Sequence, residues 1–423
     1  MNVIEKILAR LLGFQGYIVP REILYAITII IIVLLLGFVF SPYNVFTILL
    51  SLTLTLLMLP LLSIPLAYKA NIRVLRKTYP GLARSYTNIE LTIYNESSMP
   101  LVVEIEEYIP SLRFAWRRII GISARGTESL MYRVRGRTGK HVIKTKTKVY
   151  DPLGIVGFEK KVIIEGDKEV KFKPRITGIR RDIRGYLTQI VPGGGFRSSL
   201  KGLGFDFYGL RKYVYGDPIK LVDWKTSARQ RELFVKEYVL ETGVRILLSV
   251  LFSNESFRGD PSVFENVSEA IVSVADRLLV SGNSLGLVVG APLYNGLIGV
   301  GQGKSILNGV IELLSNVPWL SDGYVDLDAF AKNILRASKH PRNTRLLIIL
   351  HATDEDSTRK LCEKILRLQK VGFESLNLVI LEAISGLGRL YYMLEEKGVK
   401  ITRVKENDRE IIAEKIIEVL GGS

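Results

Sequence analysis

Apolar and polar positions divide the chain into regions, and the first region is a long uncharged run. No charged residue occurs from Ile23 to Tyr68, and one helical crossing of a membrane needs roughly 20 apolar residues. The turn-forming residues Ser41 to Asn44 interrupt the run. The pattern predicts an N-terminal transmembrane α-hairpin over residues 23–68, with helices at about 23–40 and 45–68.

Basic residues lie on both outer flanks of this run. Lys6 and Arg21 precede it, Lys69 and Arg73 follow it, and the turn carries no charge. Positive residues stay on the cytoplasmic side of a membrane. We therefore expect a cytoplasmic N-terminal segment at residues 1–22 and a multi-pass protein of the cell membrane whose soluble domains are cytoplasmic.

The second region, residues 71–174, shows the two-residue alternation of β-strands. Ile89–Tyr94 and Val142–Val149 alternate apolar with polar residues, and Gly, Pro, Asn and Ser separate such runs. Short alternating runs at this spacing are typical of a small all-β sandwich. We interpret this domain as a spacer or docking module.

The last region, residues 242–423, alternates short apolar runs with segments of helical spacing. This alternation predicts an α/β domain with a doubly wound sheet, which binds ligands at the carboxyl ends of its strands. The predicted strands are Arg245–Leu251, Ser284–Val289, Arg345–Leu350 and Leu376–Leu381, and the predicted helices are Val263–Val280, Lys304–Leu314, Thr358–Lys370 and Asp408–Leu420.

The net charge of +16 resides in two stretches. Lys69–Lys148 holds 16 basic and 6 acidic residues, and Lys171–Lys236 holds 15 and 5. Such stretches attract anionic lipid, acidic proteins or nucleic acid, or they form a solvated surface. Anionic lipid is the nearest candidate for the first stretch, which begins where the predicted hairpin ends. Aromatic interleaving is modest, so no nucleic acid is expected. Cys362 is the single cysteine, which excludes an internal disulfide and a thiolate metal cluster.

The densest motif region lies within residues 175–241, where glycines, aromatics and charges follow no helical or strand period. Arg211 and Arg229 are candidates to pair with Asp217 and Asp223, and such pairs are more often structural than catalytic. The residues that we single out as signature or structural positions are Arg211, Tyr213, Gly216, Asp217, Asp223, Trp224, Ser227, Arg229, Lys236 and Glu237.

These residues, with Arg135-Gly136-Arg137 and Asp151-Pro152-Leu153-Gly154 upstream, resemble the signature of the DUF 58 family (domain of unknown function 58). Lys220 and Val222 replace the arginine and isoleucine usual in that signature. The resemblance implies a membrane-tethered protein with a von Willebrand factor A-like domain and a link to MoxR-type AAA+ ATPases. It implies no established activity.

Domains of the A type often bind a divalent cation through an aspartate–x–serine–x–serine loop after the first strand, since hard cations prefer oxygen ligands. Here Leu251, Ser253 and Glu255 occupy those positions, so the leading carboxylate is missing. Ser253, Glu255 and Asp354 form at most a degenerate metal site. We therefore expect no cofactor.

The leading hypothesis is a non-enzymatic, membrane-anchored scaffold or adaptor. Its A-like domain would dock a cytosolic partner, which the resemblance suggests is a MoxR-type AAA+ ATPase. The alternative is a metal-dependent adhesion or binding domain, or an enzyme, centred on Asp217, Asp223 and Arg229. The sequence contains no nucleophile and base at a recognisable spacing, which favours the scaffold.

Overall fold

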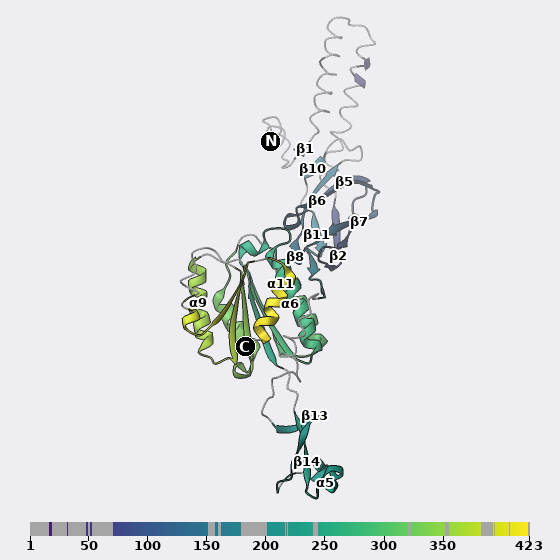
Figure 1. The fold of residues 1–423 in the computed structure, drawn as a ribbon. Coiled ribbons are helices and arrows are strands. Elements are labelled where there is room, and N and C mark those ends of the chain that lie inside the picture. Colours follow the sequence, from purple (N-terminus) through teal and green to yellow (C-terminus); the bar gives the residue numbers. More distant parts are fainter. Residues whose placement is uncertain are drawn as a thin grey trace. The chain divides into compact units, whose positions relative to one another are not determined.

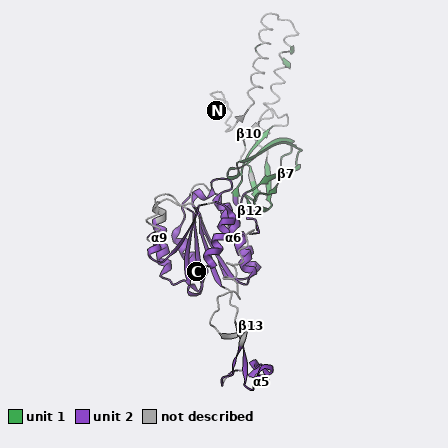
Figure 2. Cartoon of the chain, in the orientation of Figure 1, with its two compact units in different colours: residues 1–136, 141–171 green, residues 137–140, 172–423 purple. Residues whose placement is uncertain are grey.

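The chain forms two compact units (Figure 2), which are described separately below. Unit 1 comprises residues 1–136 and 141–171, and unit 2 comprises residues 137–140 and 172–423. The structure, a computed structural model, describes residues 17–18, 32, 48–49, 51–52, 71–150, 157–159, 162–178, 201–215, 217, 219–239, 244–319, 323–351, 355–381, 392, 394–405 and 407–421.

The first twelve strands form three sheets. Their order is β1-β10-β9-β5-β6 in the first, β11-β2-β4-β7 in the second and β3-β12-β8 in the third. The strands are β1 (Tyr17–Ile18), β2 (Ile72–Thr78), β3 (Gly81–Leu82), β4 (Tyr86–Asn95), β5 (Leu101–Ile109), β6 (Phe114–Ile122), β7 (Thr127–Arg135), β8 (Gly139–Val142), β9 (Lys144–Tyr150), β10 (Gly157–Glu159), β11 (Ile163–Gly166) and β12 (Glu169–Lys173), with a 3₁₀ turn η1 (Pro110–Leu112) after β5.

Alternation along these strands places every second side chain in the core of unit 1. In β4, Ile89, Leu91 and Ile93 are fully buried while the intervening residues are more accessible. Val103 on β5 and Val149 on β9 are fully buried as well. Apolar residues at period two therefore decide which face of each sheet is buried.

A buried polar network joins side chains from three strands of unit 1. The Arg76 guanidinium on β2 donates through Nε to Glu107 Oε1 on β5 at 3.0 Å. The Tyr132 hydroxyl on β7 donates to Glu107, and Trp116 stacks on the Tyr132 ring with 4.6 Å between centroids. Burial, followed by the neighbouring Glu107 charge, raises the pKa of Tyr132. A buried charge needs such partners because desolvation is costly.

Residues 201–239 form a small motif of their own, which we call the signature motif. Its two antiparallel strands are β13 (Lys201–Lys212) and β14 (Phe234–Val239). Between them lie the 3₁₀ turn η2 (Ile219–Leu221) and the short helix α5 (Trp224–Gln230).

The rest of unit 2 is an open six-stranded sheet of order β17-β16-β15-β18-β19-β20, parallel except for the antiparallel edge strand β17. Helices cover both faces (Figure 1): α6, α7 and α11 pack on one face, and α8 and α9 on the other. The elements are β15 (Arg245–Leu251), η3 (Asn254–Phe257), α6 (Val263–Val280), β16 (Ser284–Ala291), β17 (Tyr294–Gly301), α7 (Lys304–Ser315), α8 (Leu327–Ser338), η4 (Pro341–Asn343), β18 (Arg345–His351), α9 (Glu355–Gln369), β19 (Ser375–Leu381), β20 (Lys400–Val404) and α11 (Arg409–Gly421).

The fold class predicted from the sequence is wrong in its N-terminal element, the transmembrane α-hairpin. Among the described residues, no helix is both long and apolar enough to cross a membrane. The longest described helix, α6, has 18 residues and contains the charged residues Glu265, Glu269, Asp276 and Arg277. Apart from Ile32 and four positions between 48 and 52, the predicted hairpin at residues 23–68 lies outside the described residues. The location in the cell membrane stays a prediction.

Candidate functional site

The signature motif contains the first group of predicted site residues, and an ion pair shapes its first turn. Arg211 at the end of β13 binds Asp217 through two parallel contacts, Nη1 to Oδ2 at 2.6 Å and Nη2 to Oδ1 at 2.7 Å. The Val214 amide donates to the same carboxylate at 2.8 Å. The Arg211 hydrogen bond, followed by that of Val214, lowers the pKa of Asp217 to about 2. The Arg211–Asp217 ion pair therefore links the end of β13 to a residue six positions later in the chain.

Asp223 begins the short helix α5. Its carboxylate accepts from the Lys225 amide and the Thr226 hydroxyl, both at 3.2 Å, as an N-cap residue does. The Asp223 amide donates to the Phe234 carbonyl at 2.8 Å, and the Phe234 amide donates to the buried Ser227 hydroxyl at 2.8 Å. These bonds fix α5 against the start of β14.

The remaining signature residues surround this frame. The Tyr213 amide donates to the Leu233 carbonyl at 2.8 Å, and Lys236 is half-buried on β14. Arg229 is exposed, and the Trp224 side chain is 63% exposed. Gly216 and the side chain of Glu237 lie outside the described residues.

The two aspartates of the predicted polar centre, Asp217 and Asp223, therefore have different structural roles. Asp217 is held by Arg211 in a turn, whereas Asp223 caps a helix, so each carboxylate has its own local partners. Across the described residues, no group of three or more His, Cys, Asp or Glu side chains is arranged to hold a metal ion. The arrangement can stiffen the motif and present its exposed side chains.

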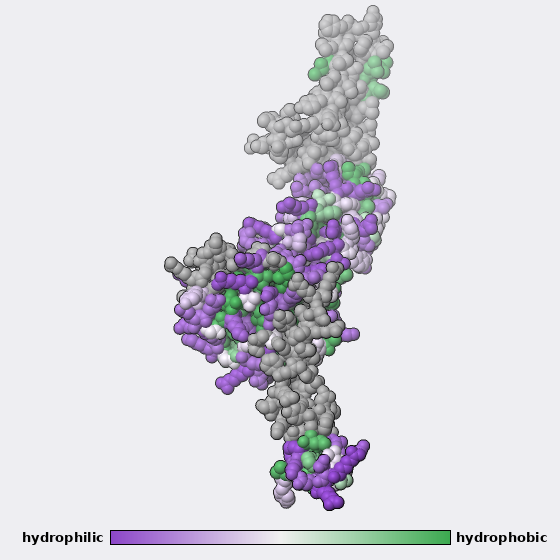
Figure 3. Space-filling view, in the orientation of Figure 1, coloured by the Kyte–Doolittle hydropathy of each residue, from purple (hydrophilic) through white to green (hydrophobic). Residues whose placement is uncertain are grey.

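Those exposed side chains are large and apolar. Tyr215 is fully exposed, Trp224, Ile219 and Val214 are more than half exposed, and Leu233 is 46% exposed. Figure 3 shows hydrophobic residues beside hydrophilic ones in the part of the surface that contains β14 and α5. We call these five residues the apolar tip. Sequence reasoning singled out only Trp224 among them, because burial cannot be read from a segment without periodicity.

The second candidate region is the carboxyl edge of the six-stranded sheet, where the degenerate metal site was predicted. Ser253 and Ser256, which follow β15, form a capping box around η3. Both hydroxyls lie close to the Nδ1 atom of the buried His351 at the end of β18, at 3.2 Å for Ser253 and 2.9 Å for Ser256. Ser256 is fully buried, so no substrate reaches its hydroxyl. The contacts of Ser253 and Ser256 with His351 stabilise the loop that contains η3.

Glu255, the second proposed ligand, has a partner of its own. Glu255 pairs with Arg258 at 2.9 Å on the surface, where both side chains are more than half exposed. Asp354 lies outside the described residues. Sequence reasoning missed His351, whose position at the carboxyl end of a predicted strand was the available signal.

The fold and the motif define a class: a protein with an open α/β domain that is preceded in the chain by a small two-stranded motif. Residues 209–361, which include most of the signature motif, match the family described as Protein of unknown function DUF58. No curated protein matches the chain.

Solved structures resemble parts of the chain at low similarity. An aerotolerance-related membrane protein from Bacteroides fragilis is 14% identical over 43% of this chain and 99% of its own, with a TM-score of 0.32. Proximal thread matrix protein 1 from the mussel byssus is 10% identical over 41% of this chain and 47% of its own, with a TM-score of 0.29. A CARDB domain from Pyrococcus furiosus is 11% identical over 22% of this chain and 89% of its own, with a TM-score of 0.17.

Proposed function

We propose that this protein is a non-enzymatic scaffold that docks a protein partner through the apolar tip of its signature motif. The observation that carries the proposal is the exposure of five large apolar side chains within residues 214–233. A two-stranded sheet with one short helix is too small to bury them, since isolated hairpins are marginally stable in water. A partner surface that covers them gains the free energy of burying apolar area.

The charges around the apolar tip indicate the chemistry of the partner. Lys220, Lys225, Arg229 and Arg231 are exposed. The three acidic residues of the same segment have partners: Asp217 pairs with Arg211, Glu232 pairs with Lys212 at 2.5 Å, and Asp223 caps α5. The surface therefore suits a partner whose contact area combines apolar and acidic side chains, because complementary charge speeds association and excludes wrong partners.

We propose a MoxR-type AAA+ ATPase as the partner, because the resemblance to the DUF 58 family suggests this class. We also propose that residues 242–423 are a von Willebrand factor A-like domain. The open sheet with five parallel strands and one antiparallel edge strand supports that assignment. In this proposal the α/β domain is the rigid base that carries the signature motif.

A pull-down of the full chain tests the proposal. Tyr215→Ser removes the most exposed aromatic residue of the apolar tip, and Tyr324→Ser removes one that is 93% exposed elsewhere. We expect the wild type and Tyr324→Ser to recover an AAA+ ATPase and Tyr215→Ser to recover at least tenfold less, about 1.4 kcal/mol of binding. Circular dichroism checks that both variants fold.

Three outcomes would overturn the proposal. The first is equal recovery of the ATPase by Tyr215→Ser, and the second is recovery of no ATPase by the wild type. The third is binding of the wild type, and not of Tyr215→Ser, to vesicles with anionic lipid, which would assign the apolar tip to a membrane surface.

A further inference from the structure

The six-stranded sheet of unit 2 ends at β17, an edge strand that contains no charged residue. The uncharged stretch extends well beyond the strand, because no charged residue occurs between Arg277 and Lys304, in a chain of which 24% of the residues are charged. Every residue of β17 is at least partly exposed, and Leu297 is 36% exposed. Among the described residues, no strand pairs with the outer side of β17. The strand therefore presents a row of backbone N–H and C=O groups that another strand can pair with.

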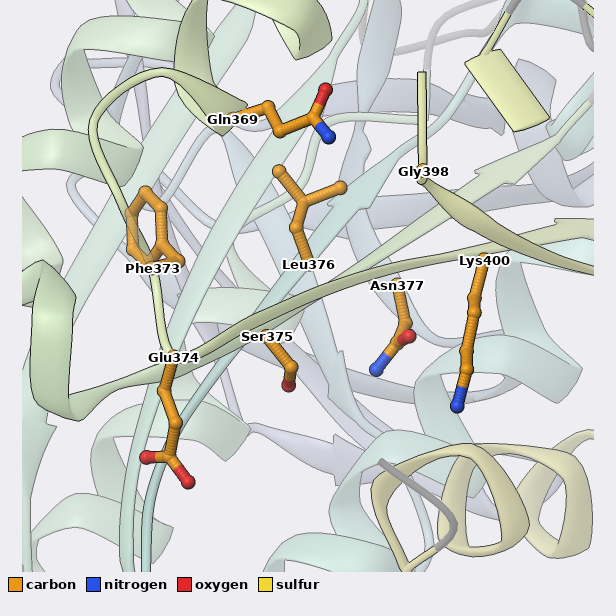
Figure 4. A pocket seen from close by; sticks show the side chains of 8 residues that line it. All are labelled: Gln369, Phe373, Glu374, Ser375, Leu376, Asn377, Gly398 and Lys400. Carbon is orange, nitrogen blue, oxygen red and sulfur yellow. The ribbon is translucent and has the colours of Figure 1, made fainter. Parts of the chain in front are cut away.

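The edge strands elsewhere in the molecule carry the protection that β17 lacks. In unit 1, the edge strand β6 contains Arg117 and Arg118. At the other edge of the six-stranded sheet, β20 begins with Lys400, whose side chain is drawn in Figure 4, and also contains Arg403. Charged side chains and prolines on an edge strand discourage its pairing with a second strand. β17 has neither, so its backbone is open to such pairing.

The absence of charge on β17 favours a second copy of this chain as the partner. Each copy carries a net charge of +16, so two copies repel each other wherever their basic surfaces meet. Like charges directly opposite each other on paired strands are also destabilising. On β17, two identical strands can meet without such opposition. A strongly charged partner, in contrast, would find no complementary charge on this strand.

The register of β17 indicates how two copies would pair. β17 follows β16 residue by residue from Tyr294 to Ile298, and the register shifts before Gly301. Antiparallel pairing of two copies of residues 294–298 places the middle residue, Gly296, at a two-fold axis, which is the symmetry of most homodimers. Gly296 has no side chain to hinder the close approach of the two backbones. The two Leu297 side chains then lie diagonally across the strands, about 7–8 Å apart.

We propose that β17 pairs antiparallel with β17 of a second copy, so that two six-stranded sheets become one continuous sheet of a homodimer. Strand addition of this kind gains its affinity from backbone hydrogen bonds along the edge. The pairing would cover the exposed edge and would leave the charged edge strand β20 at both ends of the joined sheet. This interface does not involve the apolar tip.

Sedimentation velocity of the full chain at micromolar concentration tests the proposal. We expect the wild type to sediment with twice the mass of one chain. Leu297→Lys and Leu297→Glu each place two like charges across the paired strands, so we expect each to dimerise at least tenfold more weakly. An equimolar mixture of the two variants should restore the dimer, because opposite charges then meet. Leu75→Lys is the matched control, since Leu75 is 39% exposed on β2, an interior strand of its sheet, and it should dimerise as the wild type does.

Hydrogen exchange of the wild type tests the same interface without a substitution. We expect backbone amides within residues 294–298 to become more protected as the protein concentration rises. This measurement still decides if the Leu297 variants do not fold, which circular dichroism shows.

A monomeric wild type overturns the proposal, and so does exchange in residues 294–298 that is independent of concentration. A dimer that both Leu297 variants retain, or that Leu75→Lys weakens equally, overturns it as well, because the copies would then meet elsewhere. Tyr215→Ser is expected to remain dimeric, and Leu297→Lys is expected to recover the ATPase as the wild type does. Failure of the dimer is therefore distinguishable from failure of the docking role of the apolar tip.

Discussion

Replacement of Arg137 by alanine is expected to destabilise unit 2 by about 2–4 kcal/mol. Arg137 donates through Nε to Glu265 Oε2 at 3.0 Å and through Nη2 to the Gly259 carbonyl at 2.6 Å. Its guanidinium also lies 4.6 Å from the centre of the Trp319 ring. Its loss would leave the carboxylate of Glu265, which is 1% exposed, without its cation.

The magnitude follows from these contacts. Removal of one partner of a buried ion pair costs about 3–5 kcal/mol. Here the cost is lower, because the Arg137 side chain is 22% exposed and the Ser262 amide still donates to Glu265 at 2.9 Å. For a domain of this size, a loss of 1 kcal/mol lowers the Tm by about 2–4 °C.

The effect is expected to depend on pH. Burial by itself raises the pKa of Glu265, but hydrogen bonds from Arg137 and Ser262 outweigh it, and the pKa lies below its usual value. A carboxyl whose pKa is lowered by folding stabilises the protein above its unfolded pKa of about 4.3. This contribution is lost as the pH falls through the folded pKa. The difference between the wild type and Arg137→Ala is therefore largest near neutral pH.

The assay is urea unfolding of the full chain, followed by Trp319 fluorescence after Trp116 and Trp224 are replaced by phenylalanine. Trp319 then reports unit 2 alone. Arg258→Ala is the control, because its exposed pair with Glu255 is worth less than about 1 kcal/mol. The reasoning is refuted if Arg137→Ala destabilises no more than Arg258→Ala, or if its effect is the same at pH 3 and pH 7.

Three further predictions concern single side chains. Asp217 should titrate with a midpoint of about 2, because hydrogen bonds from Arg211 and Val214 favour its charged form, and any stabilisation from this pair is lost only as the pH falls through that value. A carbon-detected NMR titration that places the midpoint near 4 would contradict this. Phe264→Ala should cost about 3–5 kcal/mol of unfolding free energy, since the ring is fully buried in the core of unit 2; thermal unfolding measures it, and a loss below 1 kcal/mol would be inconsistent with that core. Burial raises the pKa of the Cys362 thiol to about 11, so iodoacetamide at pH 8 should alkylate it at least about a hundredfold more slowly in the native chain than in urea, and equal rates would show that it is accessible.

Much of the α/β domain was predictable because its elements have strong local patterns. The four strands and four helices predicted after residue 242 are found at nearly the same bounds, for example α6 at Val263–Val280. The elements that were missed include two weak strands: β17 is half-exposed along its length, and β20 has five residues of mixed polarity. The helix α8 was missed as well, although it has 12 residues and buries Phe330 and Ile334. The prediction of a transmembrane hairpin was wrong: it rested on an uncharged run, an interrupting turn and basic flanks, whereas no described helix is long and apolar enough to cross a membrane.

The sequence by itself determined the local features of the regular regions, which are the positions where apolar residues recur at period two or 3.6. That Asp223 begins a helix was found only in the structure. The sequence also sufficed to recognise the signature residues, because the signature is defined by residue types at fixed spacing along the chain. Only the tertiary structure decided which polar groups meet, since Arg137 and Glu265, or Ser256 and His351, are about a hundred residues apart in sequence. It also decided that the uncharged strand β17 lies at an edge of its sheet, because the order of the strands depends on how all the elements pack together.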